Sequence, residues 1–262
     1  MRIATWNVNS INARIEHLIN FIRKDKSDIY LIQELKCTNE NFPYKEIEKL
    51  NYFSYVNGQK AWNGVAILSK KKIDIKCYKI PTYKEDLNSR FIESEIKIEG
   101  INKKIKLICI YLPNGNPIGT EKFEYKINWM KKFNKYVDEL ISNDFPIIIG
   151  GDFNVIPTDD DVYSPENFKD DACAHPDTRE QYQILINKGF VDTVKYFIEG
   201  KTNWTFWGYR GGNWQKGNGL RIDHFLTSPE ITDKIKKVEI NREPRGLEKA
   251  SDHTPVIIEI SN

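Results

Sequence analysis

Short apolar runs separated by polar turns recur along most of the chain, and this spacing is typical of β-strands. The first run alternates apolar and polar residues from position 2 and ends in polar side chains. Several later runs are almost wholly apolar, as expected of strands buried on both faces. The sequence predicts strands at residues 2–8, 29–33, 64–69, 91–98, 105–112, 145–149, 220–227 and 255–260.

Helical periodicity is visible in three places, at residues 12–24, 120–142 and 178–187. In the first, Ile15, Leu18, Ile19 and Ile22 fall on one stripe. Many strands with few, separated helices do not fit a regular strand–helix alternation. The pattern instead predicts a mixed or antiparallel α+β architecture in which helices cover sheet faces. Because no repeat, linker or low-complexity run interrupts the chain, residues 1–262 are expected to form one domain.

Composition narrows the class of protein without deciding it. The 262 residues are 40% hydrophobic, which suffices for a large core. Lys and Arg number 39 against 37 Asp and Glu, and this balance is weak evidence against a nucleic-acid partner. The four cysteines lack Cys-x-x-Cys spacing, so neither a zinc knuckle nor a disulfide framework is expected. Without a signal peptide or an apolar run of about 20 residues, we expect a cytoplasmic protein with no membrane partner.

Polar side chains stand where the predicted strands end. Burying many carboxylates and amides for stability alone would be costly, whereas convergence on a cation would offset that cost. Hard divalent ions such as Mg²⁺ take oxygen ligands, so Cys/His zinc chemistry does not fit these clusters. The candidate oxygen donors are Asn7, Glu34, Asp152, Asn154, Asp223 and Asp252.

Each cluster has a structural explanation when it is taken alone. Asp152 and Asn154 follow an apolar run and could be turn residues. Glu34 alone is more often a surface residue or a helix cap, and Asp252 with His253 could be a structural pair. The combination is harder to explain by chance, and it favours a metal-dependent site.

Seven motifs give the chain a resemblance to the exonuclease III family of AP endonucleases, within the endonuclease/exonuclease/phosphatase superfamily. They are WNVN (6–9), QELK (33–36), NGVA (63–66), YLPNG (111–115), GDFNVIP (151–157), GLRID (219–223) and SDHTPV (251–256). The Gly-Asp-x-Asn and Ser-Asp-His elements are shared across the superfamily. Those around Tyr111 and Arg221 are more particular to the repair nucleases. The resemblance implies a DNase I-like fold, a four-layer αββα sandwich of two mixed β-sheets flanked by helices.

The resemblance also implies how the site would hold a metal ion. Glu34 would be the principal Mg²⁺ ligand, with Asn7 beside it and Asp252 near. Mn²⁺ is a possible substitute for Mg²⁺.

The reaction would be hydrolysis of a phosphodiester. Asp152 would orient or deprotonate the attacking water, and Asn154 would hold that water or the phosphate. His253 would bind a phosphate oxygen, with its imidazole oriented by Asp223. Tyr111 would donate its hydroxyl hydrogen to the phosphate or the leaving oxygen. Asn114 would contact the phosphate as well.

The segment at residues 204–210 is unusually aromatic, and with Trp214 it holds three of the six tryptophans. Some of these side chains are expected to pack in the core. The resemblance favours Phe206 and Trp207 as part of a pocket for a base-less sugar or an opened duplex. Leu220 stands where some relatives carry Trp. Basic residues could contact the DNA backbone or form a solvated face: Arg210, Lys216, Arg221, Arg242, Arg245 and Lys249.

The expected function is that of a monomeric DNA-repair nuclease. It would cut double-stranded DNA 5′ to abasic sites, remove 3′ blocking groups as a 3′-phosphatase and 3′-phosphodiesterase, and degrade duplexes as a 3′→5′ exonuclease. One alternative is another phosphoesterase of the superfamily, such as an inositol-polyphosphate phosphatase or a sphingomyelinase. Another is a non-catalytic DNA-binding relative, although the candidate site residues are all present.

Overall fold

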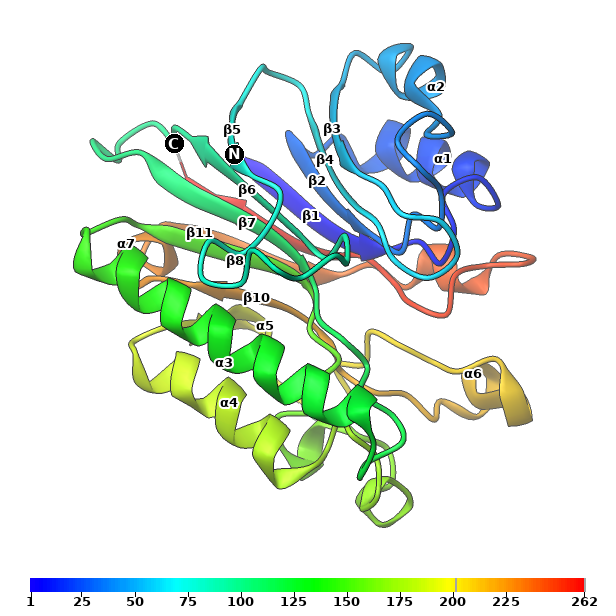
Figure 1. Cartoon of the computed structure of the whole chain (residues 1–262). Coiled ribbons are helices and arrows are strands. Elements are labelled where there is room, and N and C mark those ends of the chain that lie inside the picture. The colour runs from blue at the N-terminus through cyan, green and yellow to red at the C-terminus, as the bar shows by residue number, and fades with distance from the viewer. Residues whose placement is uncertain (201, 262) are drawn as a thin grey trace.

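Two six-stranded β-sheets face each other in the computed structural model, which describes residues 1–200 and 202–261. The first sheet has the order β11-β12-β1-β2-β4-β3, and the second has the order β5-β6-β7-β8-β10-β9. Helices lie on the outer face of each sheet (Figure 1). The predicted α+β class and four-layer αββα sandwich are therefore confirmed.

The strands of the first sheet are β1 (Arg2–Asn7), β2 (Ile29–Gln33), β3 (Phe53–Asn57), β4 (Val65–Ser69), β11 (Ile235–Ile240) and β12 (Val256–Ile260). Those of the second are β5 (Asp74–Cys77), β6 (Phe91–Ile96), β7 (Ile105–Tyr111), β8 (Ile147–Asp152), β9 (Val191–Asp192) and β10 (Asp223–Thr227). All eight predicted strands are present; the strand at 29–33 has the predicted bounds, and each of the others differs at one or both ends. The strands that the sequence missed are β3, β5, β9 and β11.

The main core lies between the two sheets, and the alternation of side chains along each strand builds it. Ile3 and Leu31 from the first sheet and Leu107 and Ile148 from the second belong to one buried cluster. Their chain neighbours face outward; Ala4, for example, packs in the cluster beneath α1. Strands buried on both faces explain the continuous apolar runs of the sequence.

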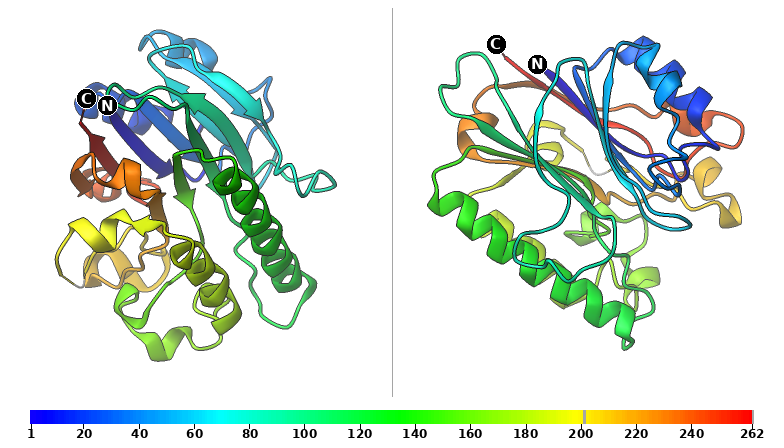
Figure 2. Two further views of the ribbon diagram at one scale, coloured as in Figure 1. Left: turned by 90° about the vertical axis from the view of Figure 1, so that its left-hand side faces the viewer. Right: turned by 45° about the horizontal axis from the view of Figure 1, so that its top comes forward.

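The helices cover the sheets in two groups (Figure 2). On the first sheet lie α1 (Ile15–Asp25) and the short α2 (Tyr44–Glu48). On the second lie α3 (Glu121–Ser142) and α4 (Pro176–Asn187), which pack on each other. The remaining short helices are α5 (Thr193–Phe197), α6 (Asn213–Lys216) and α7 (Pro229–Thr232). Among the described residues, none of the helices combines the length and hydrophobicity needed to cross a membrane.

Strand direction brings the polar motifs to one end of the sandwich. Strands β1 and β2 are parallel, so Asn7 pairs with Gln33 at their carboxyl ends. Strands β7 and β8 are also parallel, and there Tyr111 pairs with Asp152. Asp152 in turn pairs with Asp223 at the start of β10. Asn7 Nδ2 donates to Asp152 Oδ2 at 2.9 Å, so the ends of β1, β2, β7 and β8 meet the start of β10 at one place.

Candidate active site

The polar strand ends surround a cleft of about 380 Å³ at that end of the sandwich. Glu34, Asp152 and His253 each offer a ligand atom here, and these atoms lie within 4.8 Å of one another. Asp152 and His253 are almost fully buried, and Glu34 lies at the cleft wall. Gly151 permits this arrangement, because a Cβ at its position would lie 2.0 Å from the carbonyl oxygen of Ile110.

Glu34 is held by three donors from different parts of the chain. The side-chain amide of Asn7 donates to Glu34 Oε1 at 2.9 Å, and the hydroxyl of Tyr111 donates to the same oxygen at 2.8 Å. Lys36 Nζ lies 2.9 Å from Glu34 Oε2. Burial raises the pKa of Glu34, but Lys36 and the Asn7 hydrogen bond outweigh it, so the net pKa is lowered. The carboxylate therefore stays ionised and suits a divalent cation.

Asn7 was expected to ligate the metal, and the structure gives its side chain a different contact. Its Nδ2 donates to Glu34 Oε1 and to Asp152 Oδ2, each at 2.9 Å. Its Oδ1 accepts the backbone N–H of Asn9 at 2.9 Å. Because that backbone donor fixes the amide orientation, Asn7 presents nitrogen, not oxygen, to the carboxylates. It lies between the two acids, and its role as a metal ligand stays a prediction.

His253 is clamped between two carboxylates. Its Nδ1 lies 2.9 Å from Asp223 Oδ2, and its Nε2 lies 3.7 Å from Asp152 Oδ2. Burial lowers the pKa of His253, but Asp223 and Asp152 outweigh it and raise the net pKa above the ordinary value. Thr205 Oγ1 donates to Asp223 Oδ2 at 2.7 Å, which fixes that carboxylate. A protonated imidazole here offers Nε2–H toward the cleft, as a phosphate donor requires.

Asp152 and Tyr111 have complementary proton preferences. Burial raises the pKa of Asp152, and His253 counteracts this only in part. A carboxylate whose pKa is raised is a stronger base than a free one. Burial, Glu34 and Asp152 all raise the pKa of Tyr111, so its phenol keeps its hydrogen. The cleft thus holds one candidate proton acceptor and one candidate hydrogen donor.

Two asparagines, Asn114 and Asn154, also line the cleft. Asn114 Nδ2 donates to Asn154 Oδ1 at 3.1 Å, and Asn154 Nδ2 donates to the carbonyl of Leu112 at 2.9 Å. The backbone N–H of Asn154 also donates to Asp152 Oδ1 at 2.9 Å. Asn154 has a φ of 47°, a left-handed conformation that asparagine tolerates better than most residues. Asn114, Asn154 and Asp152 therefore form one connected unit.

The family follows from comparison with known proteins. Residues 4–253 match the model of the Endonuclease/Exonuclease/phosphatase family. The chain belongs to this family. It is 32% identical to exodeoxyribonuclease III of Haemophilus influenzae, over 98% of both chains. It is 29% identical to a DNA-(apurinic or apyrimidinic site) endonuclease of Dictyostelium discoideum, over 98% of this chain and 69% of that one.

Solved structures of this family agree with the sequence relatives. A 3′ phosphatase from Neisseria bound to a product DNA hairpin superposes with a TM-score of 0.93 at 32% identity, over all of both chains. An AP endonuclease from Archaeoglobus fulgidus gives a TM-score of 0.92 at 31% identity, with the same full coverage. The predicted resemblance to the exonuclease III branch is confirmed, and with it the class of DNA-repair nuclease.

Phe206 and Asp252, two of the expected site residues, line the cleft. The ring of Phe206 lies edge-on to that of His253, with centroids 4.9 Å apart. Asp252 also lines the cleft, where its Oδ1 accepts from Asn9 Nδ2 at 2.9 Å. Asp252 lies outside the close group of Glu34, Asp152 and His253, so it is at most a neighbour of a metal held there.

Arg221 and Trp207 do not line the cleft, which corrects the expectation that they contact substrate. Arg221 is 1% exposed, and its guanidinium lies 2.7 Å from both Asp161 and Asp192. Trp207 is 2% exposed and packs edge-on against Trp214 with centroids 4.8 Å apart. Both side chains are buried, Arg221 between Asp161 and Asp192 and Trp207 against Trp214 of α6.

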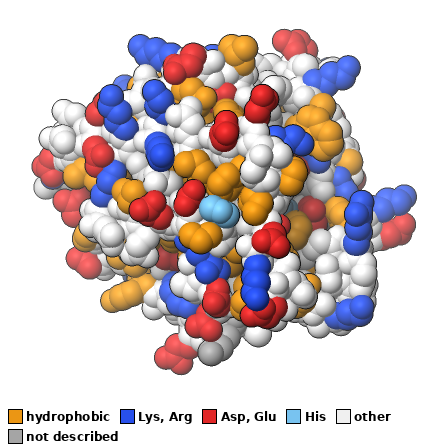
Figure 3. Space-filling model, turned by 60° about the horizontal axis from the view of Figure 1, so that its bottom comes forward, with side chains coloured by type: hydrophobic (Ala, Val, Ile, Leu, Met, Phe, Trp, Pro, Cys, Tyr) orange, Lys and Arg blue, Asp and Glu red, His pale blue; other side chains and the backbone are white. Residues whose placement is uncertain are grey.

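Of the other basic candidates, one is buried and four are exposed. Arg245 is buried, with its Nη2 donating to the carbonyl of Trp207 at 2.9 Å. Arg210, Lys216, Arg242 and Lys249 are exposed. On the face shown in Figure 3, acidic and basic side chains are interspersed rather than gathered by sign.

Sequence reasoning missed several cleft residues. Trp62 is 75% exposed, lines the cleft and lies under Lys36, whose Nζ is 5.9 Å from the ring centroid. Asn9 links Asp252 to the first motif. Asn9 and Lys36 lie within the motifs given above, and Trp62 directly precedes the motif at 63–66. Their position in or beside a motif was therefore the feature of the sequence that could have indicated them.

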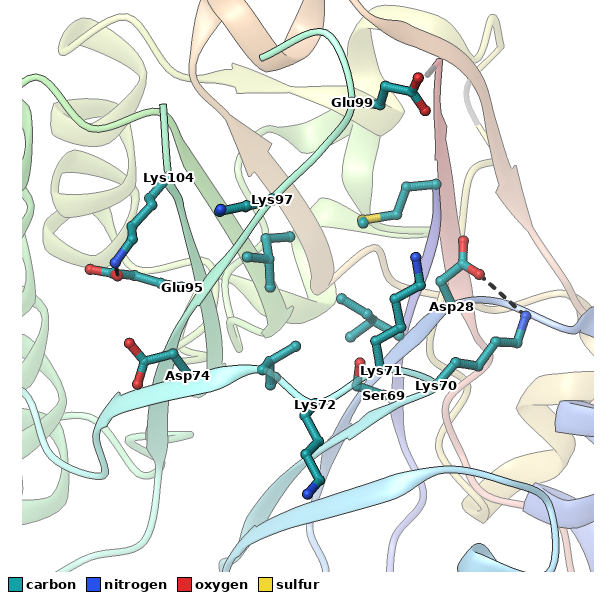
Figure 4. Close-up of a pocket in the computed structure, with 14 residues that line it drawn as sticks. Asp28, Ser69, Lys70, Lys71, Lys72, Asp74, Glu95, Lys97, Glu99 and Lys104 are labelled. Atoms are coloured by element: carbon teal, nitrogen blue, oxygen red, sulfur yellow. Dashed lines mark hydrogen bonds and ion pairs between the residues drawn. The ribbon is translucent and has the colours of Figure 1, made fainter. Parts of the chain in front are cut away.

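A second cavity of about 590 Å³ opens at the opposite ends of β1, β2 and β4 (Figure 4). Lysine and acidic side chains line this cavity, and some form ion pairs. Lys70 Nζ lies 3.3 Å from Asp28 Oδ1, and Lys104 Nζ lies 2.7 Å from Glu95 Oε2. None of the predicted site residues lines it. The predicted site residues that line a cavity are therefore in the first cleft.

Proposed function

We propose that this nuclease cuts double-stranded DNA 5′ to abasic sites, removes 3′ phosphates and other 3′ blocking groups, and degrades duplexes from their 3′ ends. The observation that carries the proposal is the convergence of Glu34, Asp152 and His253 within one cleft. Asn114 and Asn154 line the same cleft, and their polar side chains are suited to a phosphate. The names of the relatives, an AP endonuclease and a 3′ phosphatase among them, support these substrates.

In the proposed reaction, a water oxygen attacks phosphorus and the bond from phosphorus to the leaving oxygen breaks. Asp152 accepts the proton of the water, since burial makes its carboxylate a stronger base. His253 donates Nε2–H to a phosphate oxygen, with Asp223 holding Nδ1. Tyr111 donates its hydroxyl hydrogen to the phosphate or the leaving oxygen. Asn114 and Asn154 hold the phosphate and the water.

The carboxylate of Glu34 is the residue we propose to hold Mg²⁺, with Asp252 nearby and Mn²⁺ as a substitute. The donors fit, because two carboxylates lie together in a cleft without any thiolate partner among the clustered residues. Bound Mg²⁺ would neutralise charge that develops on the phosphate oxygens. Asn7 would keep Glu34 and Asp152 at a fixed spacing.

An apolar part of the cleft is suited to a sugar that carries no base. Phe206, Leu220 and Ile222 line one side, beside His253. A normal nucleotide would bring a base into this space, whereas a base-less sugar would bury its apolar edge there. We propose that this side of the cleft selects the abasic site.

The proposed active form is a monomer of one domain spanning residues 1–262, since Glu34, Asp152 and His253 already come together within one chain. A location in the cytoplasm remains a prediction. Size-exclusion chromatography with light scattering, with and without duplex DNA, tests the monomer. A stable dimer in both samples would contradict it.

A substrate panel separates the proposal from its alternatives. The panel holds a duplex with one abasic-site analogue, a duplex with a 3′ phosphate, an undamaged recessed duplex, an inositol polyphosphate and sphingomyelin. Each is incubated with Mg²⁺, Mn²⁺ or EDTA, and Asp152→Asn serves as the matched inactive control. The proposal predicts metal-dependent turnover of the DNA substrates. Turnover of only the inositol phosphate or the lipid would favour another phosphoesterase, and DNA binding without turnover would favour a non-catalytic relative.

A further inference from the structure

A buried lysine lies directly behind the phosphate-binding wall. Lys126 belongs to α3 and is fully buried. Its Nζ donates to the carbonyl of Asn114 at 3.0 Å and to that of Asn154 at 2.6 Å. One ammonium group therefore ties together the backbones of the two asparagines whose side chains meet in the cleft.

The approach to these carbonyls is open only because of a glycine. Gly115 has a φ of +85°, and a Cβ there would lie 2.5 Å from Lys126 Cδ. The lysine stem passes through the space that any other residue would fill. The loop that carries Asn114 is thus shaped around Lys126.

Burying this cation without a carboxylate hydrogen-bond partner is costly. Among the described residues, Lys126 Nζ donates hydrogen bonds to these two carbonyls and to no carboxylate. Burial lowers the pKa of Lys126, and Cys173, Asp171 and Asp152 nearby offset this only in part. Methionine would fill the same space without the ammonium, but it would leave the carbonyls of Asn114 and Asn154 without this donor.

Resting on the proposed function, we propose that Lys126 is a positioning residue that fixes Asn114 and Asn154 for phosphate binding. It acts through the two carbonyls and does not touch the substrate. The effect extends to Asp152, whose Oδ1 accepts the backbone N–H of Asn154. The left-handed φ of Asn154, 47°, is held in place from its carbonyl side by the same contact.

The test compares Lys126→Met with Lys131→Met, an exposed lysine on the same helix as the matched control. Single-turnover cleavage of the abasic duplex is measured per folded molecule, together with Kd for that duplex. For K126M we expect a loss of rate of roughly tenfold to a hundredfold, the scale of a ~1 Å misplacement of reacting groups. Its Kd should change by less than about threefold, and K131M should match wild type.

Two further variants separate positioning from folding. K126R keeps the charge and donors at slightly different positions, so its rate should lie between those of wild type and K126M. In an Asn154→Ala background, K126M should add much less than its effect in wild type, because both act through one unit. A wild-type rate in folded K126M overturns the inference. If K126M does not fold, a wild-type rate in K126R overturns it instead. Failure of wild type to cut would contradict the proposed function itself, which is a separate outcome.

Discussion

His253 Nδ1 lies 2.9 Å from Asp223 Oδ2, and the two residues come from chain segments 30 positions apart. Asp223 opens β10, whereas His253 precedes β12 in the other sheet. The contact therefore joins the two sheets at the cleft. It fixes the ring and directs Nε2 toward Asp152, 3.7 Å away.

Asp223→Asn tests this contact. The amide cannot support a charged imidazole, so the pKa of His253 should fall and the phosphate should lose a donor. We expect cleavage of the abasic duplex to slow by at least about a hundredfold at neutral pH, by analogy with other carboxylate–histidine pairs. Asp233→Asn, at an exposed aspartate, is the control. Equal rates for both variants would remove Asp223 from the reaction.

Asp152→Asn should abolish turnover while leaving the fold intact. The asparagine keeps the size of the side chain and can still accept the backbone N–H of Asn154, but it cannot take a proton. We expect a rate loss of at least about a hundredfold, within the range for removal of a general base. Circular dichroism and the denaturation midpoint report the fold. A variant that cuts near the wild-type rate would exclude Asp152 as the base.

Arg221→Met should destabilise the protein rather than weaken DNA binding. Removing the guanidinium leaves the buried Asp161 and Asp192 without their common partner, which costs about 3–5 kcal/mol. Urea denaturation measures this loss. Arg210→Met, at an exposed arginine, should leave stability within about 0.5 kcal/mol of wild type. A stable R221M that binds DNA weakly would restore Arg221 as a substrate contact.

The same cluster predicts how stability depends on pH. Burial raises the pKa of Asp161 and of Asp192, but Arg221 outweighs it, so both folded-state pKa values are lowered. The stabilisation is therefore complete above the unfolded pKa of about 3.9 and is lost as pH falls through the folded values. Urea midpoints measured downward from about pH 5 should fall more steeply in wild type than in R221M. Parallel curves would contradict the assignment.

Salt dependence tests the exposed cations. If Arg210 contacts a phosphate, R210M should reduce the slope of log K against log salt by about 0.9. Fluorescence anisotropy with the abasic duplex at several salt concentrations gives that slope. An unchanged slope would place Arg210 on a solvated face instead.

The buried strands and long helices were predictable from sequence because burial on both faces leaves continuous apolar runs. The missed strands are edge or exposed ones, such as β11 (Ile235–Ile240), in which exposed lysines interrupt the apolar pattern. Strand ends were less predictable. Leu220 forms isolated bridges with Val162 and Phe206 instead of joining the sheet, so β10 begins at Asp223 rather than at Leu220.

The motifs that contain the cleft residues could be recognised in the sequence, but the direction in which each side chain points could not. Leu220 and Ile222 line the cleft while Arg221 between them points inward, and Phe206 lines it while Trp207 does not. Neighbours in extended chain point to opposite sides, and the sequence does not show which side faces the substrate. Lys126 was missed because a lysine within a helix reads as a surface residue.

The most direct test of the account is the position of the cut in a duplex with a single abasic-site analogue. The labelled strand is incubated with wild type and with Asp152→Asn, in Mg²⁺ and in EDTA, and the product is sized at single-nucleotide resolution. The account predicts one cut immediately 5′ to the abasic site, made only by wild type and only with the metal. An initial internal cut elsewhere, a cut in EDTA, or no cut with Mg²⁺ would contradict it, whereas gradual shortening from 3′ ends is the separate exonuclease activity.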